Sequence, residues 1–304
     1  MKIDLSLFNE EVQVGTDLCQ QIETFGYEAY LVGGCVRDIV RWYKNGQKGD
    51  PKIHDVDIAT NMPIDELYDN FKCSSNNGEA HGTILVKWQK EVFEVTQFRT
   101  DGDYSDGRHP DSVQFTKSFK DDVARRDFTI NAMGIDCRGN LIDYYNGEKD
   151  LDDHILRTVG DSNQRFGEDA LRIIRAMRFA ARFGMKIDPD TMQGIKNIKG
   201  NLDKIAKERI GAELMKTAEY GKKAFADVIG LLMKTGANEV IDPEMLINWK
   251  FAKQLTRKYA AMDDTDADTK VLFGLLFYDC DNLPECIKLF RLENDLIEDR
   301  KSVV

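Results

Sequence analysis

The sequence predicts an α+β fold, in which a small mixed β-sheet with flanking helices is followed by an all-helical part. Residues 28–32, 54–60, 83–88 and 92–98 have the spacing of short strands. From about residue 150 onward, the apolar residues recur with the spacing of helices and alternate little. At 304 residues and 42% hydrophobic content, the chain can bury one large core or two modest ones.

Helices are expected in the first part at residues 7–25, 36–43, 63–71 and 122–133. In the third of these, two acids would occupy the first turn, where negative charge favours the helix dipole. In the helical part, Asp161-Ser162 and Asp188-Pro189 predict helix starts. The polar, glycine-containing segments 45–54 and 99–111 are expected to be loops.

The composition argues against several classes of protein. No apolar run approaches the roughly 20 residues that span a bilayer, and the N-terminal segment lacks the apolar core of a signal peptide. The six cysteines form no Cys-x-x-Cys pair, so we expect no zinc site or disulfide framework but reduced thiols in the cytoplasm. The net charge of −11 argues against a protein that coats nucleic acid nonspecifically, although local basic patches can still bind RNA.

Residues 54–60, with the sequence HDVDIAT, carry two acids that alternate with a β-branched residue. Successive side chains of a strand point to opposite faces, so Asp55 and Asp57 are expected on one side. Two adjacent carboxylates repel each other unless a cation lies between them, and Mg²⁺ is a hard cation that takes carboxylate and phosphate oxygens. The alternative is a pair of solvated acids at a strand edge.

Upstream of these acids, residues 30–38 (YLVGGCVRD) predict a strand, a glycine pair and the start of a helix. Gly33 and Gly34 would let the backbone approach a ligand closely, and the amides of a helix N-terminus attract phosphate. Arg37 would lie in the first turn of that helix. An ordinary strand-to-helix turn is the alternative, but a glycine turn followed by two acids favours a phosphate cradle beside a metal site.

Residues 33–38 (GGCVRD) together with residues 55–57 (DVD) resemble the nucleotidyltransferases of the polymerase-beta superfamily. Later motifs narrow the resemblance to the class II tRNA nucleotidyltransferases, the CCA-adding enzymes, with bacterial poly(A) polymerases as close relatives. The resemblance implies that Asp55 and Asp57 are catalytic carboxylates that bind Mg²⁺. It also implies a third catalytic carboxylate on a neighbouring strand, for which Glu94 is the candidate; a surface acid is the alternative for Glu94.

Residues 124–132 (ARRDFTINA) match the family's motif for ribose and triphosphate. The resemblance implies that Arg126 binds phosphate and that Asp127 and Asn131 hold the ribose hydroxyls. Because they are four residues apart, Asp127 and Asn131 would share one face of the expected helix. The alternative is a charged helix surface.

Residues 165–182 predict a helix whose arginines gather within about 120° of arc, namely Arg172, Arg175, Arg178 and Arg182. No acid after Asp169 balances them within this helix, so an anionic ligand is expected rather than a solvated stripe. The resemblance implies that Asp169 and Arg172 select the base, since a carboxylate accepts from the exocyclic amine of C or A. An intrahelical ion pair is the alternative. The resemblance assigns phosphate binding to Gly34, Arg37, Arg126, Arg175 and Arg178.

The resemblance covers about residues 27–214 and implies three parts. These are a nucleotidyltransferase catalytic head at 1–148, a helical neck with the nucleotide-selecting helix at 149–220, and a helical body at 221–304. Enzymes of this class usually continue through a longer body and tail, so the tail is expected to be absent from this sequence.

The resemblance also implies a function, the template-independent addition of CMP and AMP to the tRNA 3′ end. The enzyme would use CTP, ATP and Mg²⁺ and would bind the acceptor stem of the tRNA. Residues 99–111 resemble the loop that switches the site from cytidine to adenosine, which favours addition of the complete CCA. The alternatives are a poly(A) polymerase, an enzyme that adds only part of CCA, and a non-catalytic RNA- or nucleotide-binding module. The sequence leaves the oligomeric state open.

Overall fold

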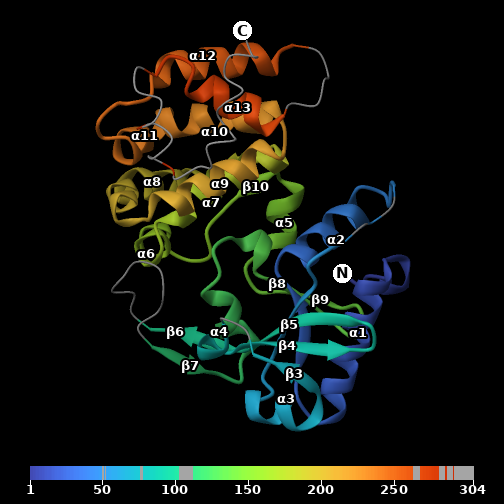
Figure 1. Cartoon of the computed structure of the whole chain (residues 1–304). Helices are drawn as coiled ribbons and strands as arrows, with labels where there is room; N and C mark the ends of the chain where they lie inside the picture. Colours follow the sequence, from blue (N-terminus) through green and yellow to red (C-terminus); the bar gives the residue numbers. More distant parts are fainter. Residues whose placement is uncertain are drawn as a thin grey trace. The chain divides into compact units, whose positions relative to one another are not determined.

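The computed structural model describes residues 1–49, 51, 53–75, 78–102, 112–262 and 268–280, together with Glu285 and Phe290. The chain divides into two compact units. Among the described residues, the first unit extends to Gly160 but omits His154–Leu156, which belong to the second unit with the chain from Asp161 onward. Figure 1 shows a sheet among helices in the first unit and helices almost throughout the second. The predicted α+β class is therefore confirmed.

The described strands of the first unit are β1 (Ala29–Val32), β2 (Asp57–Thr60), β3 (Lys72–Ser74), β4 (Thr83–Trp88), β5 (Glu91–Gln97), β6 (Arg99–Asp101), β7 (Val113–Phe115), β8 (Met133–Asp136) and β9 (Leu141–Asp143). Seven of them form one sheet with the order β3-β4-β5-β2-β1-β8-β9. Neighbours in this sheet pair antiparallel except β2 and β5, which run parallel, so the sheet is mixed as predicted. Strands β6 and β7 form a separate antiparallel pair.

The helices of the first unit are α1 (Glu10–Thr24), α2 (Gly34–Lys44), α3 (Ile64–Asn70), α4 (Phe119–Ala124) and α5 (Gly147–Asp152), with 3₁₀ turns η1 (Leu5–Leu7), η2 (Glu79–His81) and η3 (Thr129–Asn131). Helix α1 packs closely on one face of the sheet, because a Cβ at Gly15 would lie 3.2 Å from Phe93 and 3.4 Å from Leu31. The next residue of β1, Val32, points the other way into a core that includes Phe98 and Phe119.

The described helices of the second unit are α6 (Ser162–Glu168), α7 (Leu171–Phe183), α8 (Pro189–Ile198), α9 (Lys207–Ala218), α10 (Lys222–Thr235), α11 (Ala237–Ile241), α12 (Trp249–Ala260) and α13 (Thr269–Leu276), with the 3₁₀ turn η4 (Lys199–Lys204). Helix α10 packs against α7, α9 and α12 (Figure 1). Strands β10 (Ile155–Leu156) and β11 (Lys186–Ile187) form a short parallel pair. Both predicted helix starts are confirmed, since Asp161 and Asp188 accept hydrogen bonds from backbone amides of the following turns.

Several sequence-based expectations need correction. The helix predicted at 122–133 ends at Ala124, because Phe128 is extended and pairs with Thr158, a contact that a local pattern cannot reveal. The first helix begins at Glu10 after a 3₁₀ turn rather than at residue 7. Strands β8 and β9 were not expected at all. The division into head, neck and body at residues 148 and 220 stays a prediction.

Two further expectations concern membranes and cysteines. None of the helices in the described part of the chain is long and apolar enough to cross a membrane. The described free thiols are those of Cys19, Cys35, Cys73 and Cys137. Cys280 is disulfide-bonded, so the expectation of reduced thiols is wrong at that position.

Candidate active site

The sheet brings two of the predicted carboxylates side by side. Strands β2 and β5 run parallel with Ile58 opposite Val95, so Asp57 at the start of β2 falls beside Glu94. Along β5, Phe93 and Val95 are buried whereas Glu94 is exposed, which turns Glu94 to the face away from α1. Glu94 thus lies beside Asp57, and its role as a third catalytic carboxylate stays a prediction.

Asp57 lies in a strongly negative environment. Its burial raises the pKa of its carboxyl to about 6, and the charges of Glu94, Asp55 and Glu11 act in the same direction. The guanidinium of Arg126 opposes them only in part. The carboxylates around Asp57 thus form an anionic pocket, which a cation would stabilise.

This donor set fits a hard divalent cation, because it consists of carboxylate oxygens in a negative field. The described residues nevertheless include no group of three or more His, Cys, Asp or Glu side chains arranged to hold a metal ion. A cation that is held by one or two carboxylates and by substrate phosphates needs no such closed set. The site is consistent with metal use of that kind.

The structure corrects the expected conformation of Asp55. Strand β2 begins only at Asp57, and Asp55 is exposed with a left-handed φ of 55°. Aspartate adopts this region more readily than most residues, but the conformation still has to be imposed. The neighbouring residue imposes it, since Val56 is buried and its amide donates to Glu11 Oε1 at 3.0 Å. The expectation that Asp55 lies on the strand was therefore wrong, although its charge still acts on Asp57.

The glycine turn lies between opposite charges. Gly33 has a φ of 77° and forms the N-cap of α2, as the predicted strand-to-helix turn requires. A Cβ at Gly33 would lie 3.5 Å from Asp57 Oδ2 and 3.5 Å from Arg126 Nη1. The backbone thus passes between a carboxylate and a guanidinium, and glycine leaves this approach open. Gly34 begins α2, and a Cβ there would lie 3.5 Å from Arg37 Nη2.

Arg37 belongs to a buried hydrogen-bond chain. Its side chain donates to Asp38 through Nε and Nη2, and its Nη1 donates to Asn131 Oδ1 at 2.8 Å. Asn131 Nδ2 in turn donates to Asp127 Oδ1 at 3.0 Å. Asp127 and Asn131 therefore do meet, but through the 3₁₀ turn η3 rather than on the face of a helix. Because Arg37 is only 4% exposed, it lies inside the fold, where it holds Asn131.

Arg126 is held by a carboxylate that the sequence analysis missed. Its Nη2 donates to Asp122 Oδ2 at 3.3 Å, and its Nη1 donates to the Asn131 carbonyl at 3.5 Å. Its buried Nε has no hydrogen-bond partner among the described residues. Burial alone would raise the pKa of Asp122, but Arg125 and Arg126 hold it below its usual value. The guanidinium of Arg126 is thus fixed beside the glycine turn, where its positive charge suits a phosphate.

In the second unit, Asp169 is not inside a helix as expected. It is the C-cap of α6 with extended backbone, φ −142° and ψ 105°, directly before α7. Its Oδ1 accepts from the Leu171 amide at 3.0 Å, and its Oδ2 accepts from Arg209 Nη2 at 3.2 Å. The carboxylate is thus fixed at a junction between helices. The alternative of an ion pair with Arg172 on one helix face assumed a helical Asp169, whereas Asp169 is extended and its carboxylate pairs with Arg209.

The arginines of the second unit are also held by acids. Arg172 Nη1 donates to Glu168 Oε2 at 2.6 Å and to the Arg165 carbonyl at 3.0 Å. Arg178 Nε donates to Glu213 Oε2 of α9 at 2.6 Å, and both side chains are buried. The helix predicted over residues 165–182 is interrupted at Asp169 and resumes as α7. The inference that its arginines need an anionic ligand does not hold for Arg172 and Arg178, because Glu168 and Glu213 pair with them. Arg175 lies 5.5 Å from the centre of the Phe179 ring.

The carboxylates and the glycine turn belong to the first unit, and Asp169 with the arginines of α7 belongs to the second. Most of the expected switching loop, residues 103–111, lies outside the described residues; its first residues form β6, and β7 follows it.

Residues 29–157 match the family described as Poly A polymerase head domain, and residues 184–246 match that described as Probable RNA and SrmB- binding site of polymerase A. The CCA-adding enzyme of Enterococcus faecalis is 35% identical over 308 residues, which cover 99% of this chain and 71% of that enzyme. The chain belongs to the CCA-adding enzyme family. The nucleotidyltransferase resemblance is therefore confirmed.

The CCA-adding enzyme of Lactobacillus johnsonii is 41% identical over 224 residues, 73% of this chain and 53% of that enzyme. The chain thus spans about half the length of this family member. The crystal structure of Bacillus stearothermophilus CCA-adding enzyme in complex with CTP matches with a TM-score of 0.79 and 32% identity, over 97% of this chain and 69% of that one. This match confirms the nucleotidyltransferase fold.

Asp57→Asn should stabilise the metal-free protein in a pH-dependent way. Because the folded-state pKa is raised from 3.8 to about 6, ionisation of Asp57 opposes folding, and this cost grows as pH rises from about 4 through 6. The variant should gain on the order of 2 kcal/mol near pH 8 but little near pH 4. Unfolding in denaturant with EDTA across this range measures it. Asp69→Asn, at an exposed site on α3, should give no pH-dependent gain; an equal gain in both variants would refute the assignment.

Asp122→Asn should destabilise the protein by about 3 kcal/mol, because it removes the buried counter-charge of Arg125 and Arg126. The matched control is Asp121→Asn, since Asp121 is exposed and its side chain accepts only from Thr116 Oγ1. The control should change the free energy of unfolding by less than about 1 kcal/mol. Similar losses in the two variants, measured by denaturant unfolding, would contradict the role of Asp122.

Proposed function

We propose that this chain is a CCA-adding tRNA nucleotidyltransferase that transfers CMP from CTP and AMP from ATP to the tRNA 3′ end and releases pyrophosphate. The single observation that carries the proposal is the position of Asp57 beside Glu94, with Arg126 across the glycine turn. Family membership supports the substrates, because the matched enzymes are named for CCA addition and one was crystallised with CTP. The cytoplasmic location expected from the sequence stays a prediction.

Asp55 and Asp57, with Glu94 nearby, would hold a divalent cation, for which Mg²⁺ is the best candidate by its preference for carboxylate and phosphate oxygens. When bound, it would lower the pKa of the tRNA 3′-hydroxyl and neutralise charge on the triphosphate. The 3′-oxygen attacks the α-phosphorus, the bond to the β-phosphate oxygen breaks, and pyrophosphate leaves. The rest of the catalysis is positioning by protein groups.

The first unit supplies most of that positioning. The open backbone at Gly33 and Gly34 gives the triphosphate room, and the guanidinium of Arg126 across the turn would bind a phosphate oxygen. Asp127 and Asn131, already joined by a hydrogen bond, bind the ribose hydroxyls. We assign Arg37 to orienting Asn131, because its own donors are engaged within the fold.

The second unit would select the base. Asp169 accepts from the exocyclic amine of C or A, and Arg172 donates to ring acceptors. G and U present a carbonyl at the position of that amine, and a carboxylate repels it. Arg209 holds Asp169 in place and Glu168 holds Arg172, the two side chains that would contact the base. Arg175 would contact phosphate, whereas Arg178 is engaged by Glu213, so its assignment to phosphate has less support.

Asp55→Ala should reduce CMP and AMP incorporation by at least about a thousandfold while leaving the fold intact, because Asp55 is exposed and outside the strand. Incubation of tRNAs that lack CCA, CA or A with single nucleoside triphosphates measures incorporation and shows how many nucleotides are added. His54→Ala, at the exposed neighbouring residue, should retain activity. Wild-type activity in Asp55→Ala would remove the metal assignment, and wild-type inactivity on all three tRNAs would overturn the proposed function.

Asp169→Ala should relax the choice of CTP and ATP over UTP and GTP. The loss of one good hydrogen-bonding pair corresponds to about 1–3 kcal/mol, or roughly a fivefold to 150-fold fall in discrimination. The ratio of kcat/KM values for the four nucleotides measures it. The control is Asp203→Ala, which removes an exposed carboxylate of η4 in the same unit. If discrimination against UTP and GTP is unchanged in Asp169→Ala, the base-selection role is wrong.

A further inference from the structure

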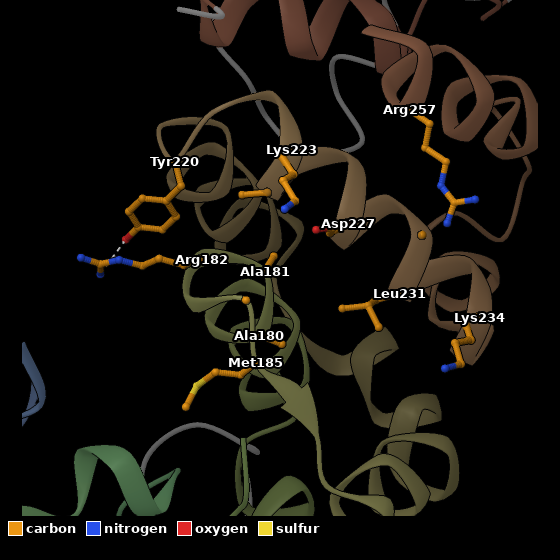
Figure 2. A pocket seen from close by; sticks show the side chains of 13 residues that line it. Ala180, Ala181, Arg182, Met185, Tyr220, Lys223, Asp227, Leu231, Lys234 and Arg257 are labelled. Carbon is orange, nitrogen blue, oxygen red and sulfur yellow. Dashed lines mark hydrogen bonds between the residues drawn. The ribbon is translucent and has the colours of Figure 1, made fainter. Parts of the chain in front are cut away.

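A basic hollow lies in the second unit, away from the residues assigned to base selection. It has a volume of about 640 Å³ and is lined by α7, α10, α12 and the segments that follow α7 and α9 (Figure 2). Small residues make room for it, since Ala180, Ala181, Gly184, Ala224 and Gly230 all contribute to its wall. The hollow is thus a built feature of how these helices pack.

Cations outnumber acids around the hollow. Lys223 and Lys234 of α10 and Arg257 of α12 line it, with Asp227 as its acid, and all four side chains are exposed. The side chains of Lys223, Lys234 and Arg257 make no hydrogen bond or ion pair with residues that the structure describes. In a chain with a net charge of −11, such a group of unneutralised cations points to an anionic partner.

The three cations form a row along α10. Lys223 and Lys234 are eleven residues apart, which corresponds to about 16 Å along the helix axis. Arg257 enters between them, because a Cβ at Gly230 would lie 3.5 Å from Arg257 Nη2. Figure 2 shows Arg257 descending from α12 toward the stretch of α10 between the two lysines. One phosphate group cannot contact the whole row, whereas a nucleic-acid strand presents a phosphate at each step.

The hollow offers charge but no free aromatic face. Tyr220 at its edge is already used, since its hydroxyl accepts from Arg182 Nη1 at 3.1 Å and from Arg178 Nη1 at 3.3 Å. The guanidinium of Arg182 lies 4.5 Å from the centre of the Tyr220 ring (Figure 2). Contacts of this kind favour phosphates over bases, because phosphate contacts fix a nucleic acid without reading its sequence.

We propose that Lys223, Arg257 and Lys234 bind consecutive backbone phosphates of the RNA substrate, independently of base sequence. This inference rests on the proposed function, which supplies RNA as the partner. It assigns a particular row of side chains, one of which, Arg257, lies outside the segment matched as an RNA-binding site.

The test compares two triple variants that lose the same charge. The first is Lys223→Gln/Lys234→Gln/Arg257→Gln; the control is Lys196→Gln/Lys204→Gln/Lys216→Gln, at exposed lysines of the same unit outside the hollow. Binding of fluorescent tRNA is measured without nucleotide over a range of salt concentrations. The first variant should bind about 10- to 100-fold more weakly near 0.15 M salt, and its slope of log K against log salt should fall by about 2–3. The control should change affinity by less than about threefold.

Two more measurements sharpen the test. Asp227→Asn should tighten binding by roughly twofold to fivefold, because it removes the carboxylate of the hollow. An RNA hairpin of unrelated sequence should lose affinity by the same factor as tRNA in the first variant. At saturating tRNA, the kcat for CMP incorporation should be unchanged while KM for tRNA rises, which excludes misfolding as the cause.

Three results would overturn the proposal. The first is an equal loss of tRNA affinity in the two triple variants, and the second is an unchanged salt slope in the first variant. The third is that tripolyphosphate displaces RNA from the wild type while the first variant binds RNA as tightly as the wild type does. The measurements of RNA binding do not depend on catalysis. A wild-type protein that binds RNA through the row but incorporates no nucleotide would therefore refute the proposed function and leave this inference standing.

Discussion

The mutual repulsion of carboxylates around Asp57 is the constraint on which the candidate site depends. The sheet places Asp57 beside Glu94, and burial together with neighbouring charge raises its pKa to about 6. A protein that only needed to be stable would not gather these acids. The cost is tolerated because the surrounding fold, with a well-packed core on each face of the sheet, fixes the strands. A bound cation would relieve this repulsion.

Within each unit, ion pairs and hydrogen bonds hold the candidate groups in place. In the first unit Asp122 fixes Arg126 and Arg37 fixes Asn131, and in the second unit Arg209 fixes Asp169. The contacts of Arg37 and Arg209 join residues that lie 94 and 40 positions apart in the sequence, so the placement of these groups and the completion of each unit are linked. Pre-orientation of this kind favours catalysis by positioning, because little ordering is left for the moment of reaction.

Sequence reasoning succeeded where the signal was local and failed where it was not. The glycine turn and the helix caps at Asp161 and Asp188 follow from short patterns. The conformation of Asp55 could not be predicted in this way, because the hydrogen bond from the Val56 amide to Glu11 joins residues that are 45 positions apart. The missed partner Glu213 likewise acts on Arg178 through the packing of two separate helices. Tertiary contacts decide these positions, and a single sequence does not reveal them. Asp122 is different, because it lies only four residues before Arg126, and a pair at this spacing could have been found from the sequence.

The pairing register of β5 has an implication for how the site is preserved. Phe93 and Val95 must face α1 for the core to form, and this requirement alone turns Glu94 to the opposite side. A one-residue shift in the pairing of β5 would place the carboxylate of Glu94 in the apolar core and the ring of Phe93 in water. Such a chain would be eliminated for misfolding before any loss of chemistry was felt. Selection for a buried apolar core thus preserves the orientation of the Glu94 side chain without acting on Glu94 directly.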